Sequence, residues 1–261
     1  MNKRIALAQT EHPKDMDVIK LVNEWSKQAC DAGADLVVFP ESLMTRYEEE
    51  QNDFLQAAQS IDGPFCTAIN ECALHNNMWI YYTANIASEG ALPLNTAILV
   101  TDEGKVANVY HKVHLFDSDT TTESSRMSAG SELPHCVDTP VGRLGWGICY
   151  DLRFPELTRT QALDGAQVII FSAAWVDGPE KVHQWKTLLA ARAIENGIYA
   201  IGVSRCDEGY IGSSCAFDPY GAEIASAGTT PELLVVDIDL DLVEKAQTAI
   251  PSLKNRRADL Y

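Results

Sequence analysis

The chain alternates between short apolar runs and longer segments in which apolar residues recur at helical spacing. Residues 4–10 (RIALAQT) form an apolar run that is typical of a strand. Residues 16–32 place apolar side chains on one helix face, and Gly33 can end that helix. Residues 35–39 (DLVVF) then predict a buried strand that stops at a proline. The opening forty residues therefore predict a strand, a helix and a second strand.

The same order of elements recurs later in the chain. Residues 28–41 and 161–174 both predict the end of a helix, a Gly-Ala turn and a buried strand, and residues 186–203 repeat the scheme. Two hairpin-like runs lie between them, at 96–113 and 213–228. Strands that are apolar on both faces and alternate with helices imply sheets covered by helices. We expect one layered α/β domain over residues 1–261, built from two similar halves.

Composition narrows the class of protein. The chain has 261 residues, 46% of them hydrophobic and 22% charged, which is the mixture of a globular domain. Its formal net charge of −17 disfavours binding to nucleic acid or to anionic lipid. The N-terminus lacks the apolar run of a signal peptide, and no stretch is long enough to predict a transmembrane helix. We therefore expect a cytoplasmic protein with no nucleic-acid or membrane partner.

Seven cysteines are scattered along the chain without a metal-binding or redox spacing. His111 and His114 flank Lys112, but no acid or cysteine completes a ligand set at a plausible spacing. We therefore predict no metal and no cofactor. In a cytoplasmic protein the thiols stay reduced, so a free reactive cysteine is chemically feasible.

Three reactive residue types each follow a predicted strand. Glu41 follows LVVF, Lys112 follows KVANVYH, and Cys149 follows RLGWGI at a strand-to-helix turn. The carboxyl ends of strands are where sites assemble in α/β proteins, and a cysteine near helical N–H groups is expected to have a lowered pKa. Together the three supply a base, a cation and a nucleophile for acyl transfer. Taken singly, they are equally compatible with a buried thiol, a first-turn acid and an edge lysine.

Several blocks of sequence, in order, carry a resemblance to a known family. The main blocks are DLVVFPES (35–42), YHKVHLFD (110–117) and GICYDLRFPEL (147–157). Further blocks are ARAIENGIYAIGVSR (191–205), GSSCAFDPYGAE (212–223) and RRADLY (256–261). Together they resemble the nitrilase superfamily of carbon–nitrogen hydrolases. The resemblance implies an α-β-β-α sandwich in which two sheets lie face to face between helical layers, and at least a homodimer.

The resemblance also implies roles for individual residues. Cys149 would attack an amide carbonyl while Glu41 takes the thiol proton, and Lys112 with the backbone N–H of Tyr150 would bind the oxyanion. The family has a second acid between its lysine and cysteine blocks. The segment TTESSRMSAG (121–130) matches best and places this acid at Glu123, which would hold Lys112 and help orient the substrate. The alternative is that Glu123 is a solvated loop acid.

The residues after the nucleophile bear on the substrate. The family's nitrile hydrolases usually have Trp-Glu after the cysteine, whereas this chain has Tyr150-Asp151. The string CYDLRFPEL resembles the ω-amidases, which hydrolyse ω-amides of 2-oxo dicarboxylates such as 2-oxoglutaramate. Arg153 is a candidate to pair with the distal carboxylate of such a substrate. An ion pair with Asp151, Glu156 or another structural acid is the alternative role of Arg153.

One departure leaves the substrate open. Where ω-amidases often have a Thr-rich stretch, this chain has residues 175–181 (WVDGPEK). Trp175 is expected either to line the pocket or to pack as a core aromatic. The small-molecule amide could thus be an ω-amide, an N-carbamoyl compound or deaminated glutathione, with a nitrile hydrolase or a non-catalytic scaffold as further alternatives.

Overall fold

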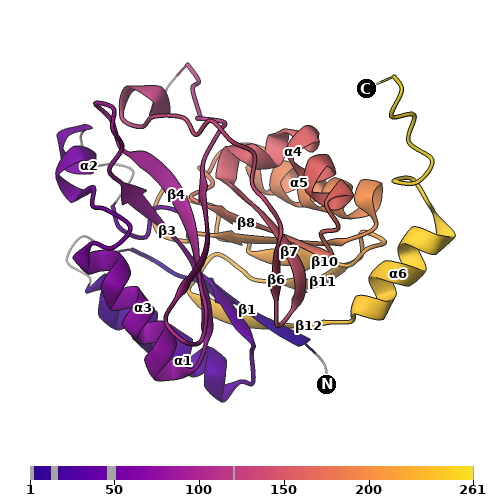
Figure 1. Cartoon of the computed structure of the whole chain (residues 1–261), viewed down its shortest axis with the longest axis horizontal. Helices are drawn as coiled ribbons and strands as arrows, with labels where there is room; N and C mark the ends of the chain where they lie inside the picture. The colour runs from indigo at the N-terminus through magenta and orange to yellow at the C-terminus, as the bar shows by residue number, and fades with distance from the viewer. Residues whose placement is uncertain (1–2, 13–16, 46–50, 120, 261) are drawn as a thin grey trace.

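The computed structural model describes residues 3–12, 17–45, 51–119 and 121–260, and it contains two six-stranded sheets between helical layers. Figure 1 shows α1 (Val18–Asp31) and α3 (Pro64–Asn76) on one side of the paired sheets and α4 (Pro155–Leu163) and α5 (Lys181–Asn196) on the other. The α-β-β-α sandwich predicted from the sequence is therefore confirmed. The near-repeat seen in the sequence corresponds to one sheet and its helices in each half of the chain.

The first sheet has the strand order β12-β1-β2-β3-β4-β5. Its three central strands, β1 to β3, run parallel, and the remaining neighbours pair antiparallel. The strands are β1 (Lys3–Gln9), β2 (Leu36–Val38), β3 (Trp79–Ile86), β4 (Leu94–Val100), β5 (Val106–His111) and β12 (Glu232–Ile238).

The second sheet has the order β11-β10-β9-β8-β7-β6 and the same plan. Strands β7 to β9 run parallel, with antiparallel partners on each side. The strands are β6 (Val137–Thr139), β7 (Gly142–Ile148), β8 (Val168–Ala173), β9 (Tyr199–Ser204), β10 (Cys215–Phe217) and β11 (Glu223–Ser226). Both hairpins predicted from the sequence are present, as β4–β5 and β10–β11.

Helices form where the sequence predicted them, near residues 16–32, 155–163 and 181–196, whereas the other α-helices were not predicted. The α-helices are α1 (Val18–Asp31), α2 (Gln51–Ala57), α3 (Pro64–Asn76), α4 (Pro155–Leu163), α5 (Lys181–Asn196) and α6 (Leu240–Ala249). Two 3-10 helices are η1 (Glu123–Ser125) and η2 (Cys149–Arg153). The side chain of Asp17 accepts the N–H of Lys20 at 3.0 Å and caps α1, and Gly33 follows its end at φ +76°.

The fully apolar strands are explained by burial on both faces. On β2, Leu36 and Val38 contribute to the core that joins the two sheets, whereas Val37 packs in the core beneath the helices of the first sheet. The hydroxyl of Tyr81 crosses between the sheets and donates to the carbonyl of Gly147 at 3.3 Å. The core between the two sheets therefore holds the end of β7, which precedes Cys149, against the first sheet.

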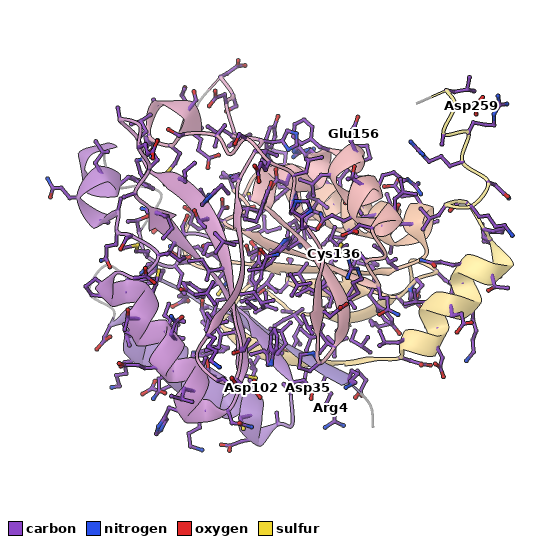
Figure 2. The ribbon with its side chains drawn as sticks, in the orientation of Figure 1. Arg4, Asp35, Asp102, Cys136, Glu156 and Asp259 are labelled. Carbon is purple, nitrogen blue, oxygen red and sulfur yellow. The ribbon has the colours of Figure 1, made fainter. Side chains whose placement is uncertain are left out.

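Several charged side chains lie at the edge of the molecule where β1 and β2 begin. Figure 2 shows Arg4, Asp35 and Asp102 together at one edge of the molecule. Arg4 lies near the amino end of β1, where it pairs with Asp237 at 2.9 Å. Glu41 and Cys149 follow the carboxyl ends of the parallel strands β2 and β7, so they lie at the other end of the strands from Arg4 and Asp35. In the part of the chain that the structure describes, no helix is long and apolar enough to cross a bilayer.

Candidate active site

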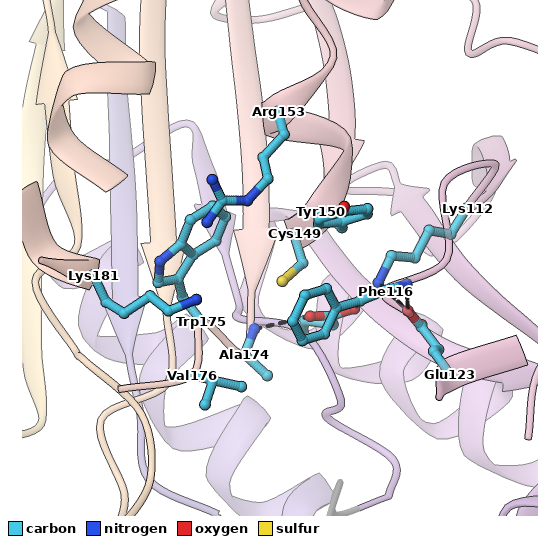
Figure 3. Close-up of a pocket in the computed structure, with 11 residues that line it drawn as sticks. Lys112, Phe116, Glu123, Cys149, Tyr150, Arg153, Ala174, Trp175, Val176 and Lys181 are labelled. Carbon is cyan, nitrogen blue, oxygen red and sulfur yellow. Dashed lines mark hydrogen bonds and ion pairs between the residues drawn. The ribbon is translucent and has the colours of Figure 1, made fainter. Parts of the chain in front are cut away.

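Three strand ends bring the predicted residues to one pocket. Glu41 follows β2, Lys112 follows β5, and Cys149 follows β7. All three line the same cavity, together with Glu123 from η1 (Figure 3). The four residues predicted from the sequence as the reactive set therefore lie together, although they span more than a hundred positions of the chain.

The ammonium group of Lys112 lies between two buried carboxylates. Its Nζ donates to Glu41 Oε1 at 3.0 Å and to Glu123 Oε2 at 2.9 Å. Glu123 is 3% exposed, and its Oε2 also accepts the backbone N–H of Phe116 at 2.6 Å. The alternative that Glu123 is a solvated loop acid is wrong. It holds Lys112 in place, as the family resemblance implied.

Asn95 also belongs to the site, and the sequence reasoning missed it. Its side-chain amide donates to Glu41 Oε1 at 2.8 Å and lies 3.4 Å from Glu123 Oε1. Its carbonyl accepts the N–H of Lys112 at 2.9 Å, because β4 and β5 pair antiparallel. Asn95 precedes the hairpin run read from the sequence, and only the strand register places it opposite Lys112.

The second oxygen of Glu41 is fixed by the other half of the molecule. Oε2 accepts the backbone N–H of Ala174, just beyond β8, at 2.9 Å, and the carboxylate lines the same cavity as the thiol of Cys149. Burial alone would raise the pKa of Glu41, but the charge of Lys112 and the N–H of Ala174 outweigh it and lower that pKa. Glu41 is therefore an ionised base beside the thiol.

The pKa of Cys149 shifts in the opposite direction to the pKa of Glu41. Burial and the neighbouring Glu41 charge raise the pKa of the Cys149 thiol well above its ordinary value, although Lys112 acts against them. The expectation that helical N–H groups would lower this pKa is wrong, because removal from water and a facing carboxylate outweigh the short 3-10 helix. The resting nucleophile is a neutral thiol, so its attack requires a base.

The backbone at Cys149 is strained. Its φ of +46° lies in the left-handed region, which a residue with a Cβ seldom adopts. Such a conformation persists only where the surroundings enforce it, and it is concentrated at functional sites. The sharp turn between β7 and η2 directs Sγ into the pocket in Figure 3.

Lys112 stays charged at neutral pH. Burial would lower its pKa, but the charges of Glu123 and Glu41 outweigh burial and raise that pKa well above its ordinary value. The site thus contains a neutral thiol, an ionised base and a fixed ammonium. This set can transfer the thiol proton to Glu41, attack a carbonyl carbon and stabilise the oxyanion that forms.

Arg153 is not held by either acid suggested as its partner. Its Nη2 donates to Gln184 Oε1 at 2.9 Å, and across the described ranges no carboxylate lies within ion-pair distance of it. Asp151 instead accepts the Tyr110 hydroxyl and the N–H of Ile148. The predicted structural ion pair is therefore wrong, and the guanidinium lines the pocket.

Trp175 fulfils both of its predicted roles. It is 4% exposed and packs on Trp185, with the ring centroids 4.9 Å apart, and it also lines the pocket. Tyr150 lines the pocket as well, next to Phe116, at 5.1 Å between the rings. The sequence reasoning missed Lys181, which begins α5 at the end of the 175–181 stretch and lines the same cavity.

Comparison with known proteins identifies the family. The family model described as carbon-nitrogen hydrolase matches residues 4–248. This chain belongs to that family. It is thus a member of a family of enzymes that hydrolyse non-peptide carbon–nitrogen bonds, and it is an amidase of the nitrilase superfamily.

Curated relatives of this carbon–nitrogen hydrolase include two amidases. The deaminated glutathione amidase of Escherichia coli O157:H7 is 34% identical over 230 residues, covering 88% of this chain and 87% of the relative. The omega-amidase NIT2 of Mus musculus is 34% identical over 254 residues, covering 92% and 88%. Equal identity to both means that sequence similarity does not choose between their substrates.

Solved structures share the fold. The NitFhit protein of Caenorhabditis elegans has a TM-score of 0.90 and 30% identity, covering 100% of this chain and 66% of that chain. A variant of an amidase from Nesterenkonia sp. AN1 has a TM-score of 0.81 and 25% identity, covering 99% and 95%. The latter structure shows covalent addition of the acetamide moiety of fluoroacetamide at the active-site cysteine of that amidase.

Proposed function

We propose that this carbon–nitrogen hydrolase cleaves the ω-amide of a dicarboxylate monoamide, a 2-oxo compound such as 2-oxoglutaramate, through a thioester on Cys149. The observation that carries the proposal is that the Cys149 thiol, the Glu41 carboxylate and the Lys112 ammonium line one cavity, with Lys112 Nζ 3.0 Å from Glu41 Oε1. The covalent adduct on the cysteine of the similar Nesterenkonia amidase supports the choice of nucleophile.

The first half of the reaction forms the thioester. Glu41 takes the thiol proton as Sγ bonds to the carbonyl carbon, and the carbonyl π electrons move to oxygen. Lys112 and the backbone N–H of Tyr150 stabilise this oxyanion. When the oxyanion collapses, the carbon–nitrogen bond breaks, and protonated Glu41 returns the proton to the leaving nitrogen. Ammonia leaves, and the acyl group remains on Cys149.

The second half consumes one water. Glu41 is again ionised and takes a proton from the water as its oxygen attacks the thioester carbon. The carbon–sulfur bond breaks and the proton returns to Sγ, which restores the resting thiol. Glu123 and Asn95 take no proton in this scheme. They keep Lys112 and Glu41 aligned through both halves.

A distal carboxylate on the substrate is supported by Arg153. A guanidinium that faces a pocket without an acidic partner is matched by a carboxylate ligand, which accepts two parallel hydrogen bonds from it. The choice of an amide over a nitrile rests on the family resemblance, because Tyr150-Asp151 stands where the family's nitrile hydrolases usually have Trp-Glu.

The test is an ammonia-release screen with the purified chain. Its panel contains ω-amides with and without a 2-oxo group, deaminated glutathione, N-carbamoyl compounds and nitriles. We expect the highest kcat/KM on a 2-oxo ω-amide, and no turnover by Cys149→Ala. Release of carbon dioxide would indicate a carbamoyl substrate, and turnover by Cys149→Ala would overturn the nucleophile assignment.

We also propose that the chain forms a homodimer, as the family resemblance implies. Supporting this are large apolar side chains that lie exposed on α4, on α5 and just after α6, namely Leu163, Ile194 and Ile250. Light scattering coupled to size exclusion tests the assembly. A mass of one chain at micromolar concentration would contradict it.

A further inference from the structure

Two cations line the pocket outside the reactive set. Arg153 projects from η2, and Lys181 is the first residue of α5. Both are half-buried, and neither has a carboxylate within ion-pair distance in the ranges that the structure describes. By contrast, Lys112 in the same pocket is paired with two acids. The two cations are thus available to a ligand.

Arg153 and Lys181 lie on one side of the pocket only. Figure 3 shows Arg153 and Lys181 on the same side of Cys149, with Trp175 between them and with Lys112 on the other side. The Arg153 guanidinium lies 4.8 Å from the centroid of the Trp175 ring, and Lys181 Nζ lies 6.0 Å from that of Phe116. Aromatic faces hold a cation without neutralising it. Each charge therefore stays available on one side of the nucleophile.

Trp175 and the start of α5 lie at this end of the pocket. The indole N–H of Trp175 is buried and finds no hydrogen-bond partner among the residues that the structure describes. Helix α5 begins at Lys181 with no side-chain cap, and the N-terminus of a helix favours an anion. The end of the pocket remote from Lys112 therefore combines two positive charges with the apolar surfaces of Trp175 and Val176.

The charge balance of the pocket agrees with this placement. The lining carboxylates of Glu41 and Glu123 outnumber Lys112, so the reactive set alone would repel an anion. Arg153 and Lys181 reverse the sign and leave the lining with one net positive charge, in a chain whose formal net charge is −17. A neutral substrate would need no such reversal.

We propose that Lys181 is a specificity residue, which together with Arg153 binds the carboxylate of the substrate's acyl arm from two sides. This rests on the proposed function for the reaction, and it adds Lys181 as a second cation for amides whose non-reacting end is anionic. Arg153 supplies the planar fork and Lys181 a point charge, so the pair fixes the carboxylate in both direction and depth.

The kinetic test compares glutaramate with valeramide, which has a methyl group in place of the carboxylate. We expect Lys181→Met to raise the KM for glutaramate about tenfold, the loss of one charge-assisted contact, with a far smaller change in kcat. The glutaramate preference in kcat/KM should fall by the same factor, and Lys181→Arg should restore most of it. An equal loss on both amides would overturn the proposal.

The matched control is Lys186→Met. Lys186 lies on the same helix but pairs with Glu223 at 2.8 Å and does not line the pocket. We expect the KM of the Lys186→Met variant for glutaramate to match that of the unaltered chain. An equal effect of both substitutions would mean that Lys181 acts through α5 stability or overall charge, and would also overturn the proposal.

A binding measurement separates this inference from the proposed reaction. Calorimetry of glutarate binding to Cys149→Ala, with and without Lys181→Met, needs no turnover. Weaker binding with Lys181→Met, together with no hydrolysis of any amide by the unaltered chain, would support the anion site and reject the reaction. Amide hydrolysis with glutarate binding that is insensitive to Lys181 would reject the anion site and keep the reaction.

Discussion

Asp151 Oδ2 accepts the hydroxyl of Tyr110 at 2.8 Å, and this contact connects the turn that carries Cys149 to the strand that carries Lys112. The same oxygen accepts the N–H of Ile148 at 2.9 Å, just before the nucleophile. The other oxygen accepts the Nδ1 of His114 at 2.8 Å, just after the lysine. One buried carboxylate thus links the chain segments that carry Cys149 and Lys112.

The first prediction removes this connection at its phenolic end. Tyr110→Phe leaves Asp151 one donor short, and it also deprives the Val113 N–H of its acceptor. We expect unfolding free energy to fall by about 1–3 kcal/mol and kcat to fall more than KM changes, because the substrate contacts remain. Urea unfolding and steady-state kinetics measure the two effects.

Tyr199→Phe is the control for this loss. Its hydroxyl also makes two hydrogen bonds, both with the backbone of Asp239, and neither residue lines the pocket. We expect a similar loss of stability and an unchanged kcat. If both variants lose kcat alike, the Tyr110 contact does not position the site.

The second prediction separates the charge of Glu41 from its role as base. Glu41 raises the pKa of the Cys149 thiol, so Glu41→Gln should lower that pKa and yield thiolate at lower pH. Turnover should nevertheless fall by about 10²–10⁴-fold, because no group is left to shuttle the proton. The difference in absorbance at 240 nm between Glu41→Gln and Glu41→Gln/Cys149→Ala follows the thiolate against pH.

The sign of the pH dependence follows from the same two groups. With Glu41 intact, its lowered pKa keeps the base ionised well below neutral pH, and the raised pKa of Cys149 keeps the thiol neutral above it. We expect kcat/KM to be flat around neutral pH and to fall only when acid protonates Glu41. A limb that rises near pH 7 to 8 would instead indicate that preformed thiolate attacks.

The strand-end positions of Glu41, Lys112 and Cys149 were predictable, because apolar runs reveal strands and the reactive residues follow them directly. The layered fold was predictable for the same reason. Asn95 was not, since its role depends on the register of β4 against β5. The direction of the Cys149 pKa shift was also missed, because it depends on burial and on a carboxylate more than a hundred residues away.

The third prediction concerns Asn95. Its amide donates to Glu41 Oε1 at 2.8 Å, and removing a donor from a carboxylate raises the carboxylate's pKa. We expect Asn95→Ala to shift the acid limb of kcat/KM to higher pH while neutral-pH activity falls less. Asn85→Ala is the control, since Asn85 lies opposite Asn95 in the pairing of β3 with β4 but donates to Thr45 at 2.9 Å instead of to Glu41. A limb that does not move would show that Asn95 leaves the base unaffected.

The last prediction concerns the cost of the buried cation. Lys112→Met leaves Glu41 and Glu123 facing each other without their shared ammonium, and breaking a buried ion pair on one side costs about 3–5 kcal/mol. Adding Glu123→Gln removes one of the stranded charges, so the double variant should regain part of this loss while remaining inactive. Lys105→Met, which removes an exposed pair with Glu103, should leave the unfolding free energy unchanged within error. A double variant no more stable than Lys112→Met would mean that Glu123 is not coupled to Lys112, and that its two short contacts serve some other purpose than holding the oxyanion cation.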